Sequence, residues 1–162
     1  MINWRKCSPN DISVIAALAQ KIWRVHYPPI IGTEQVEYML NKMYSSDALA
    51  NQFQEGQVFY LILEDELPVG FVAVSLKEVH HLFLHKFYID DSMQGKGVGA
   101  RVFQFILDAY PQITTVRLTV NRQNYRSINF YFKLGFRIDQ VADFDIGDGY
   151  VMNDFVMVYC RP

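Results

Sequence analysis

The fold is indicated most sharply by residues 86–100, which read KFYIDDSMQGKGVGA. An apolar strand ends at Ile89, and a helix is expected from about Val98 to Tyr110. The glycines between them give the backbone conformations that are closed to other residues, and they let a ligand approach closely. The free amides and the dipole of the following helix favour an anion, and Lys96 adds a positive charge nearby. The turn therefore predicts a phosphate or pyrophosphate site.

Three interpretations of this turn compete. A plain strand-to-helix turn is the simplest, but so many glycines in so short a stretch disfavour it. Residues 95–100 also fit G-x-G-x-x-G/A, a dinucleotide-binding fingerprint. That fingerprint needs an acidic residue near the end of the next strand and repeated βαβ units; Val120-Asn121 stands there, and the repeats are missing. A Walker A loop fails because no Lys-Ser or Lys-Thr follows the glycines. The third interpretation depends on the neighbouring residues.

A second pattern follows at residues 118–136, which read LTVNRQNYRSINFYFKLGF. Together the two segments resemble the GNAT N-acetyltransferase superfamily, whose Q/R-x-x-G-x-G/A hallmark is matched by Gln94, Gly97 and Gly99. The later hallmark, V-x-x-x-N-x-x-A-x-x-F-Y-x-K-x-G-F, is matched with Ser127 in place of the commoner alanine. Each motif alone is weak, but the two in order, each in its structural setting, make the resemblance specific.

The rest of the chain is compatible with this resemblance, which is close over residues 82–138. No linker or repeat divides the sequence, so a single domain is expected over residues 1–162. The resemblance implies an α/β (α+β) fold, the GNAT acyl-CoA N-acyltransferase fold. Its mixed, mostly antiparallel sheet of six to seven strands is flanked by helices and split between the two central strands. Periodicity and turn signals predict strands at 2–6, 58–63, 69–75, 82–89, 113–120, 136–138 and 150–159, and helices at 8–26, 33–43, 46–53, 98–110 and 124–134.

Capping residues mark the expected helix starts. Ser8 is the predicted N-cap of the first helix, with Pro9 in its first turn, and Thr33 and Ser46 are the predicted caps of the next two. The pair Pro28-Pro29 is expected to stop the first helix.

Composition narrows the classes of partner. The net charge of −2 and the pI near 6.0 provide no basic field for nucleic acid or an anionic membrane. Cys7 and Cys160 stand far apart without a metal-binding spacing, which predicts reduced thiols in a cytoplasmic protein. His81 and His85 would lie roughly 13 Å apart on an extended strand, too far to share a zinc ion, so no metal site is expected.

The resemblance implies acetyl-CoA as cofactor. Backbone groups of Phe87, Tyr88 and Ile89 would pair with the pantetheine arm. The turn would hold the pyrophosphate, and Lys133 would reach a phosphate. The full set of predicted cofactor contacts is Phe87, Tyr88, Ile89, Gln94, Gly95, Lys96, Gly97, Val98, Gly99, Ala100, Asn121, Asn124, Ser127, Tyr131 and Lys133.

Acetyl transfer to an amine needs an acid for the thiolate and a base for the ammonium group. Tyr131 matches the family's general-acid tyrosine, and a phenol of pKa about 10 stays protonated at neutral pH. Many members place a glutamate on the strand before the turn, but here residues 80–86 contain no carboxylate. His85 lies about where that acid is expected and is the predicted base, with proton removal through ordered water as the alternative.

The acceptor is expected between the first helices and the last hairpin. Aromatic faces and carboxylates there suit a cationic amine, and the predicted contacts are Trp23, Tyr27, Tyr38 and Asp154. The ending MNDFVM, residues 152–157, is similar to spermidine/spermine-type bacterial acetyltransferases, which favours a small amine or polyamine. A protein or peptide acceptor, an inactive acetyl-CoA sensor and, more remotely, a dehydrogenase stay open as alternative functions.

A strand near the C-terminus is expected at the sheet edge, where it could pair two copies in a homodimer.

Overall fold

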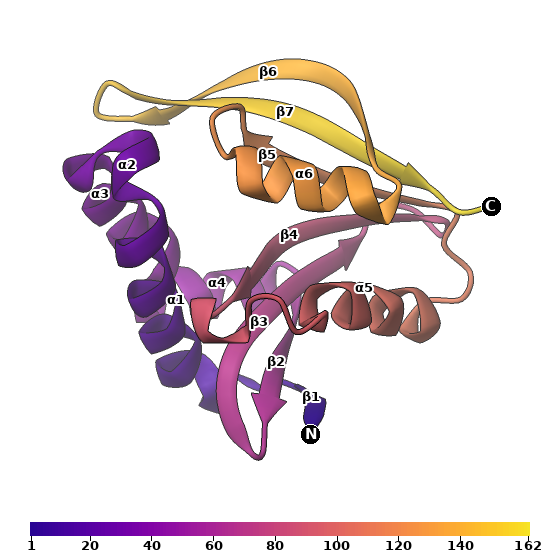
Figure 1. The fold of residues 1–162 in the computed structure, drawn as a ribbon. Helices are drawn as coiled ribbons and strands as arrows, with labels where there is room; N and C mark the ends of the chain where they lie inside the picture. Colours follow the sequence, from indigo (N-terminus) through magenta and orange to yellow (C-terminus); the bar gives the residue numbers. More distant parts are fainter.

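The computed structural model describes residues 1–162 and is built around one seven-stranded sheet of order β1-β2-β3-β4-β5-β7-β6 (Figure 1). The strands are β1 (Ile2–Lys6), β2 (Val58–Glu64), β3 (Leu67–Leu76), β4 (His81–Ile89), β5 (Thr115–Asn121), β6 (Arg137–Gly147) and β7 (Tyr150–Cys160). The helices are α1 (Ile12–His26), α2 (Pro28–Ile31), α3 (Thr33–Tyr44), α4 (Ser46–Gln54), α5 (Val98–Ala109) and α6 (Tyr125–Leu134), with 3₁₀ turns η1 (Pro9–Asp11) and η2 (Asp91–Met93). Every neighbouring pair is antiparallel except β4–β5, so the predicted mixed sheet is confirmed.

The first helix stops where Pro28-Pro29 was expected to stop it, since α1 ends at His26. The two prolines then begin the short helix α2, because prolines in a first turn lose no hydrogen bond. Two capping predictions were wrong. The side chain of Thr33 does not cap α3, whose N-cap position is taken by Gly32. The cap of α4 is Ser45 rather than Ser46, and its Oγ accepts a hydrogen bond from the amide of Ala48 at 3.2 Å. Ser8 caps as predicted, but the turn that it caps is η1.

The strand predicted at 136–138 is much longer, since β6 runs from Arg137 to Gly147. Its side chains are exposed or half-buried on both faces, so no alternation of apolar and polar residues marks it in the sequence. Backbone pairing with β7 holds it instead, over most of its length. It is the outer strand at the C-terminal side of the sheet, which confirms the expected edge strand.

Two hydrophobic clusters lie on opposite faces of the sheet. Along β2, Phe59 and Leu61 pack into the cluster of α1, α3 and α4, whereas Ile62 packs into that of α5 and α6. The helices present their buried faces at helical spacing, as α5 does with Val98, Val102, Phe103, Ile106 and Leu107. Figure 1 shows α5 and α6 in front of the sheet and α1 along its side. Packing on both faces therefore holds the helices in place against the central strands.

The central strands β4 and β5 separate after a short parallel contact. They are paired only from His81 to Phe83 on β4 and from Thr115 to Arg117 on β5. Beyond this point β4 remains paired with β3 as far as Ile89, so its other edge has no neighbouring strand. The predicted split between the two central strands is thus present. Its open edge carries backbone groups that a guest chain can pair with.

The structure has no helix suited to crossing a membrane and no disulfide. No helix combines the length and apolar character needed to cross a bilayer. Cys7 is buried, Cys160 is exposed, and both are free thiols.

Lys86 on β4 is a charged residue inside the cluster of α1, α3 and α4. Only 4% of it is exposed, and its Nζ donates a hydrogen bond to Oε1 of Gln57 at 3.0 Å. The ammonium also lies over the rings of Phe59 and Tyr44, 5.3 and 5.8 Å from their centroids. Burial lowers the pKa of Lys86 to about 8. The protein therefore carries a desolvated cation whose partners are an amide and two rings.

We expect the Lys86→Met variant to be more stable than the wild type at pH 7, by about 1–3 kcal/mol, because it removes the cost of burying the charge. The lysine pKa is lower in the folded state than in the unfolded chain, so the unfolded chain binds more protons between about pH 8 and 10.5. The free energy of unfolding of the wild type should therefore increase as pH rises through that window. The variant has no lysine at this position and should not show this increase. Urea unfolding from pH 7 to 10 measures the difference. Lys6→Met, an exposed lysine, is the control, and identical pH dependence of all three proteins would contradict the expectation.

Candidate active site

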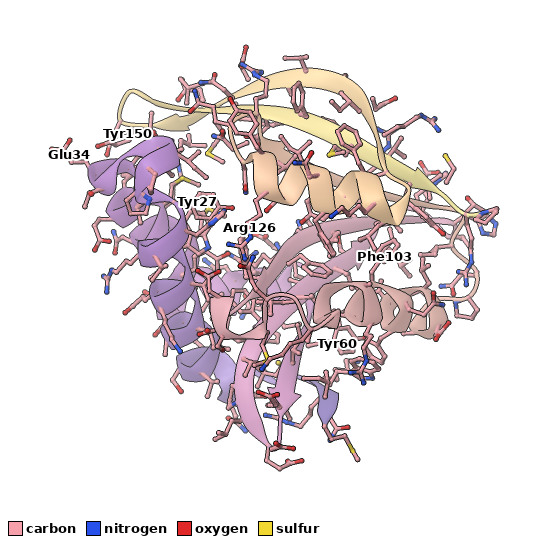
Figure 2. The ribbon with its side chains drawn as sticks, in the orientation of Figure 1. Tyr27, Glu34, Tyr60, Phe103, Arg126 and Tyr150 are labelled. Atoms are coloured by element: carbon pink, nitrogen blue, oxygen red, sulfur yellow. The ribbon has the colours of Figure 1, made fainter.

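A cavity of about 820 Å³ lies where the open edge of β4 meets the glycine turn and α6. Its lining includes Phe87, Tyr88 and Ile89 from β4 and, from the turn and α5, Gln94, Gly95, Gly97, Val98, Gly99 and Ala100. Helix α6 adds Ser127, Tyr131 and Lys133, among others, and the end of α1 adds His26 and Tyr27. Figure 2 shows Tyr27 and Arg126 in this region between α1 and α6. We call this space the cofactor cavity.

The glycines of the turn act in two different ways. Gly95 and Gly97 have φ of +72° and +70°, in the left-handed region, and a Cβ on either would meet nothing within 4 Å. At these positions the backbone conformation requires glycine, and open space lies in front of it. Gly99 is required by packing, since a Cβ there would stand 2.7 Å from the ring of Phe130. The third glycine therefore lets α5 and α6 approach each other and does not itself widen the cavity.

The first turn of α5 forms an anion site at one end of the cavity. Gly97 is its N-cap residue and offers no side chain to cap the helix. The first amides of a helix have no partner within it, and the helix dipole makes them attract negative charge. Because these residues line the cavity, the site fits a phosphate or pyrophosphate, as the sequence predicted.

Helix α6 and its N-cap residue place Asn124 and Tyr131 on one face. Asn124 is its N-cap, and its Oδ1 accepts a hydrogen bond from the amide of Ser127 at 3.4 Å and lies 3.1 Å from Nε2 of His26. Tyr131 follows two turns later at helical spacing, with its ring centroid 6.4 Å from that of Phe87. Burial raises the pKa of Tyr131 above that of a free phenol. Its hydroxyl therefore keeps its proton at neutral pH.

Three of the predicted cofactor contacts lie outside the lining of this cavity. The ammonium of Lys96 is 4.0 Å from the carboxylate of Glu64, at the surface. Asn124 is buried beside the cavity, and Asn121 lines a second cavity. All the other predicted contacts line the cofactor cavity.

The structure does not bring His85 to the cofactor cavity. Its Nε2 lies 2.6 Å from Oγ of Ser75, and its ring packs 4.7 Å from that of Phe83. Burial, with the nearby charge of Lys86, lowers the pKa of His85 to about 4. Register explains the placement, because the irregularity between Ala73 and Val74 leaves His85 without a pairing partner on β3.

The residues predicted to contact the acceptor lie in different parts of the structure. Trp23 is buried under the cavity, with its ring 4.4 Å from that of Tyr27 and 5.7 Å from that of Tyr88. Tyr38 belongs to the docking of the last hairpin on α3: its hydroxyl donates a hydrogen bond to the carbonyl of Ile146 at 2.6 Å. Its ring also packs on that of Tyr150, which lies beside α3 in Figure 2. Of this group, Tyr27 lines the cofactor cavity, and Asp154 is buried near it.

Sequence reasoning missed a cationic residue of the lining, Arg126. Its guanidinium lies 3.1 Å from the carboxylate of Asp91, so the pair links α6 to η2 at the cavity. Both side chains are about half exposed, and their ion pair is open to exchange with a bound anion. The signal was present, since Arg126 stands in the first turn of α6, directly before the motif residue Ser127.

A second, polar cavity of about 470 Å³ lies beside the first. Its lining combines four side-chain amides with apolar residues of α2 and β7, one tyrosine and one arginine whose charge is paired. These residues are Ile30, Ile31, Gln35, Asn121, Arg122, Gln123, Tyr125, Val151 and Asn153. Nε2 of Gln35 donates a hydrogen bond to the carbonyl of Val151 at 3.2 Å and so joins α3 to β7 across it. We call this space the amide cavity.

Known proteins resemble the chain in sequence. The sequence model described as "Acetyltransferase (GNAT) family" matches residues 18–136. A spermidine N(1)-acetyltransferase of Thermoplasma acidophilum is 26% identical and aligns with 96% of this chain and 95% of its own length. The peptidyl-lysine N-acetyltransferase YjaB of Escherichia coli is 30% identical over 61% of this chain and 62% of its own.

Solved structures share the fold over the whole chain. The PaiA N-acetyltransferase of Thermoplasma acidophilum, solved in complex with coenzyme A, superposes with a TM-score of 0.84 at 24% identity and covers 99% of both chains. A GCN5-related N-acetyltransferase structure from Rhodopseudomonas palustris gives a TM-score of 0.81 at 18% identity, over 98% of this chain and 95% of that one. The seven-stranded sheet with its split is therefore an arrangement that known acetyltransferases have.

We expect Gly97→Ala to weaken acetyl-CoA binding about tenfold, roughly the effect of losing one hydrogen bond to a charged group. The added methyl group strains the left-handed conformation of Gly97, the N-cap residue that leads into the first amides of α5. Gly56→Ala is a matched control, because Gly56 also has positive φ with nothing within 4 Å but lies between α4 and β2.

Both variants should lose about 1–2 kcal/mol of stability, the strain of a left-handed alanine. Only Gly97→Ala should lose affinity, which isothermal titration calorimetry with acetyl-CoA measures. Equal affinity of the two variants would show that the turn does not hold the cofactor.

Proposed function

The chain belongs to the acetyltransferase (GNAT) family, and from this premise we propose that it moves the acetyl group of acetyl-CoA to a primary amine, with Tyr131 as general acid. The observation that carries this proposal is one continuous cavity. It has an anion site at one end, formed by the first turn of α5, and the buried phenol of Tyr131 along its wall. We propose that all of residues 1–162 act as one catalytic unit, in the cytoplasm, where both free thiols would stay reduced.

Acetyl-CoA, when bound, supplies a thioester that an amine can attack. The residues of this chain fit its parts. Backbone amides at the start of α5 would hold its pyrophosphate, and Arg126 and Lys133 add positive charge at the same cavity. The open edge of β4, from Phe87 to Ile89, offers peptide groups to its pantetheine arm. A preorganised amide donor beside a carbonyl stabilises the charge that develops during attack.

Tyr131 provides the proton that the departing sulfur needs. A thiol has a pKa of about 8.5, well below that of a phenol, so the thiolate accepts the proton only when a donor is held beside it. Burial keeps Tyr131 protonated, and α6 fixes the ring against Phe87 and Phe136. The hydroxyl can regain its proton from the nitrogen that has attacked, so the residue ends the cycle unchanged.

The acceptor is proposed to enter through the amide cavity. A small amine or a polyamine remains the favoured class, supported by the relative named spermidine N(1)-acetyltransferase. A second candidate is a lysine or N-terminal amine on a peptide. It is favoured by the amide groups that line this cavity, which suit a peptide backbone, and by the relative named peptidyl-lysine N-acetyltransferase.

We expect Tyr131→Phe to lower turnover by roughly 10²–10⁴-fold and to leave acetyl-CoA affinity unchanged, because the phenyl ring keeps the packing and loses only the proton. Thiol release with acetyl-CoA and a panel of polyamines, amino acids and short peptides measures turnover and separates the two acceptor classes. Tyr159→Phe is the control, since that half-buried phenol on β7 lines neither cavity. Full turnover of Tyr131→Phe would remove the tyrosine from the mechanism.

A further inference from the structure

Asp154 on β7 is the only acidic residue of the chain that is buried. Its exposed fraction is 3%, and its Oδ1 has no hydrogen-bond partner. An ionised carboxylate without partners inside a protein is costly, so such groups are normally paired. The unsatisfied oxygen therefore indicates that a cationic or hydrogen-bonding partner belongs beside it.

The charged groups around Asp154 do not neutralise it. Arg122, which follows β5, directs its guanidinium to the backbone carbonyl of Asp154 at 3.2 Å and to the carboxylate of Asp143 on β6 at 2.9 Å. Asp143 itself adds negative charge, and Tyr27 from the end of α1 is an uncharged phenol. Burial is the main cause that raises the pKa of Asp154 to about 6, against smaller lowering effects of a hydrogen bond from Thr119 and the charge of Arg122. At neutral pH the carboxylate is ionised, and its Oδ1 is covered by protein but receives no hydrogen bond.

Register places Asp154 between the two cavities. It lies directly opposite Asn121, the last residue of β5, and next to Asn153; both of these residues line the amide cavity. Tyr27, which lines the cofactor cavity, lies near enough to Asp154 to feel its charge. Burial is the main cause that raises the pKa of Tyr27 and of Tyr131, and the charge of Asp154 adds to the shift of Tyr27.

Strand alternation also puts the two groups on different faces of the sheet. Val116, Leu118 and Val120 of β5 pack towards α5 and α6, so Asn121 and its neighbour Asp154 project to the opposite face. Tyr131 belongs to the cluster of α5 and α6. The two faces communicate at the split between β4 and β5, where an amine arriving from one face would meet a thioester held on the other.

If the proposed function holds, we infer that Asp154 takes a proton from the amine that receives the acetyl group. The sequence predicted His85 for this role. An ammonium group that enters through the amide cavity binds the free oxygen of Asp154 and transfers one proton to it. The neutral amine nitrogen then forms the new bond to carbon while the carbon–sulfur bond breaks. The second nitrogen proton leaves by way of Tyr131, whose own proton goes to the sulfur. Asp154 returns its proton to water, so the protein is unchanged and one proton is released per turnover.

The experiment compares two acceptors in the wild type and in Asp154→Asn. One is the best alkylamine of the panel, which is an ammonium ion at pH 7; the other is its fluorinated analogue, which is already neutral at that pH. We expect the variant to lose roughly 10²–10⁴-fold in kcat with the alkylamine, and less than about threefold with the neutral analogue. Asp143→Asn is the matched control, because it removes an exposed carboxylate beside the same arginine.

The pH profile gives a readout that needs no variant. With the alkylamine, wild-type kcat should fall as the carboxyl becomes protonated near pH 6, and this fall should be absent with the neutral analogue. Asp154→Asn should still bind acetyl-CoA and unfold cooperatively, since it loses an uncompensated charge. Equal losses with both acceptors, or a higher KM at unchanged kcat, would overturn the role of proton acceptor. Failure of the wild type on every amine would instead refute the proposed function.

Discussion

The separation of β4 from β5 is the constraint on which the rest of the structure depends. Two parallel strands that diverge after Phe83 leave peptide groups without partners in the middle of a sheet, which is costly unless something else satisfies them. The arrangement persists because β4 stays paired with β3 and β5 with β7 along their lengths, while helices pack on both faces. The strands on both sides of the opening are therefore held in place, and a ligand can reach the centre of the sheet there.

Each face of the sheet supplies one half of the proposed reaction. The face of α5 and α6 provides helix-terminal amides for phosphate and the buried phenol of Tyr131. The opposite face provides the amide cavity and the buried carboxylate of Asp154. Desolvation raises the pKa of both side chains, but with opposite consequences. The phenol is held protonated, whereas the pKa of the carboxyl is brought close to neutral pH. One physical effect thus suits one group to donate a proton and the other to accept one.

Much of the site could be read from the sequence where local geometry defines it. The positive φ of Gly95 and Gly97, the open N-terminus of α5 and the helical spacing from Asn124 to Tyr131 are all properties of short segments. The proposed proton acceptor, Asp154, could not be assigned in this way. His85 occupies the expected stretch of β4, but an irregularity in the β3–β4 register turns it towards Ser75. The length of β6 was equally hidden, since backbone pairing rather than an apolar pattern holds that strand.

The sequence by itself determined the family, the order of the main strands and helices, and the positions of the glycine turn and of Tyr131, because each depends on residues close together in the chain. The tertiary structure alone decided how distant segments meet. It brought the end of α1 to the start of α6, so that His26 faces Asn124, and it buried Asp154 opposite Asn121 between two cavities. The desolvation and the empty hydrogen-bonding position of Asp154 arise from groups on other elements. Such properties belong to the packed molecule, and no pattern within one segment encodes them.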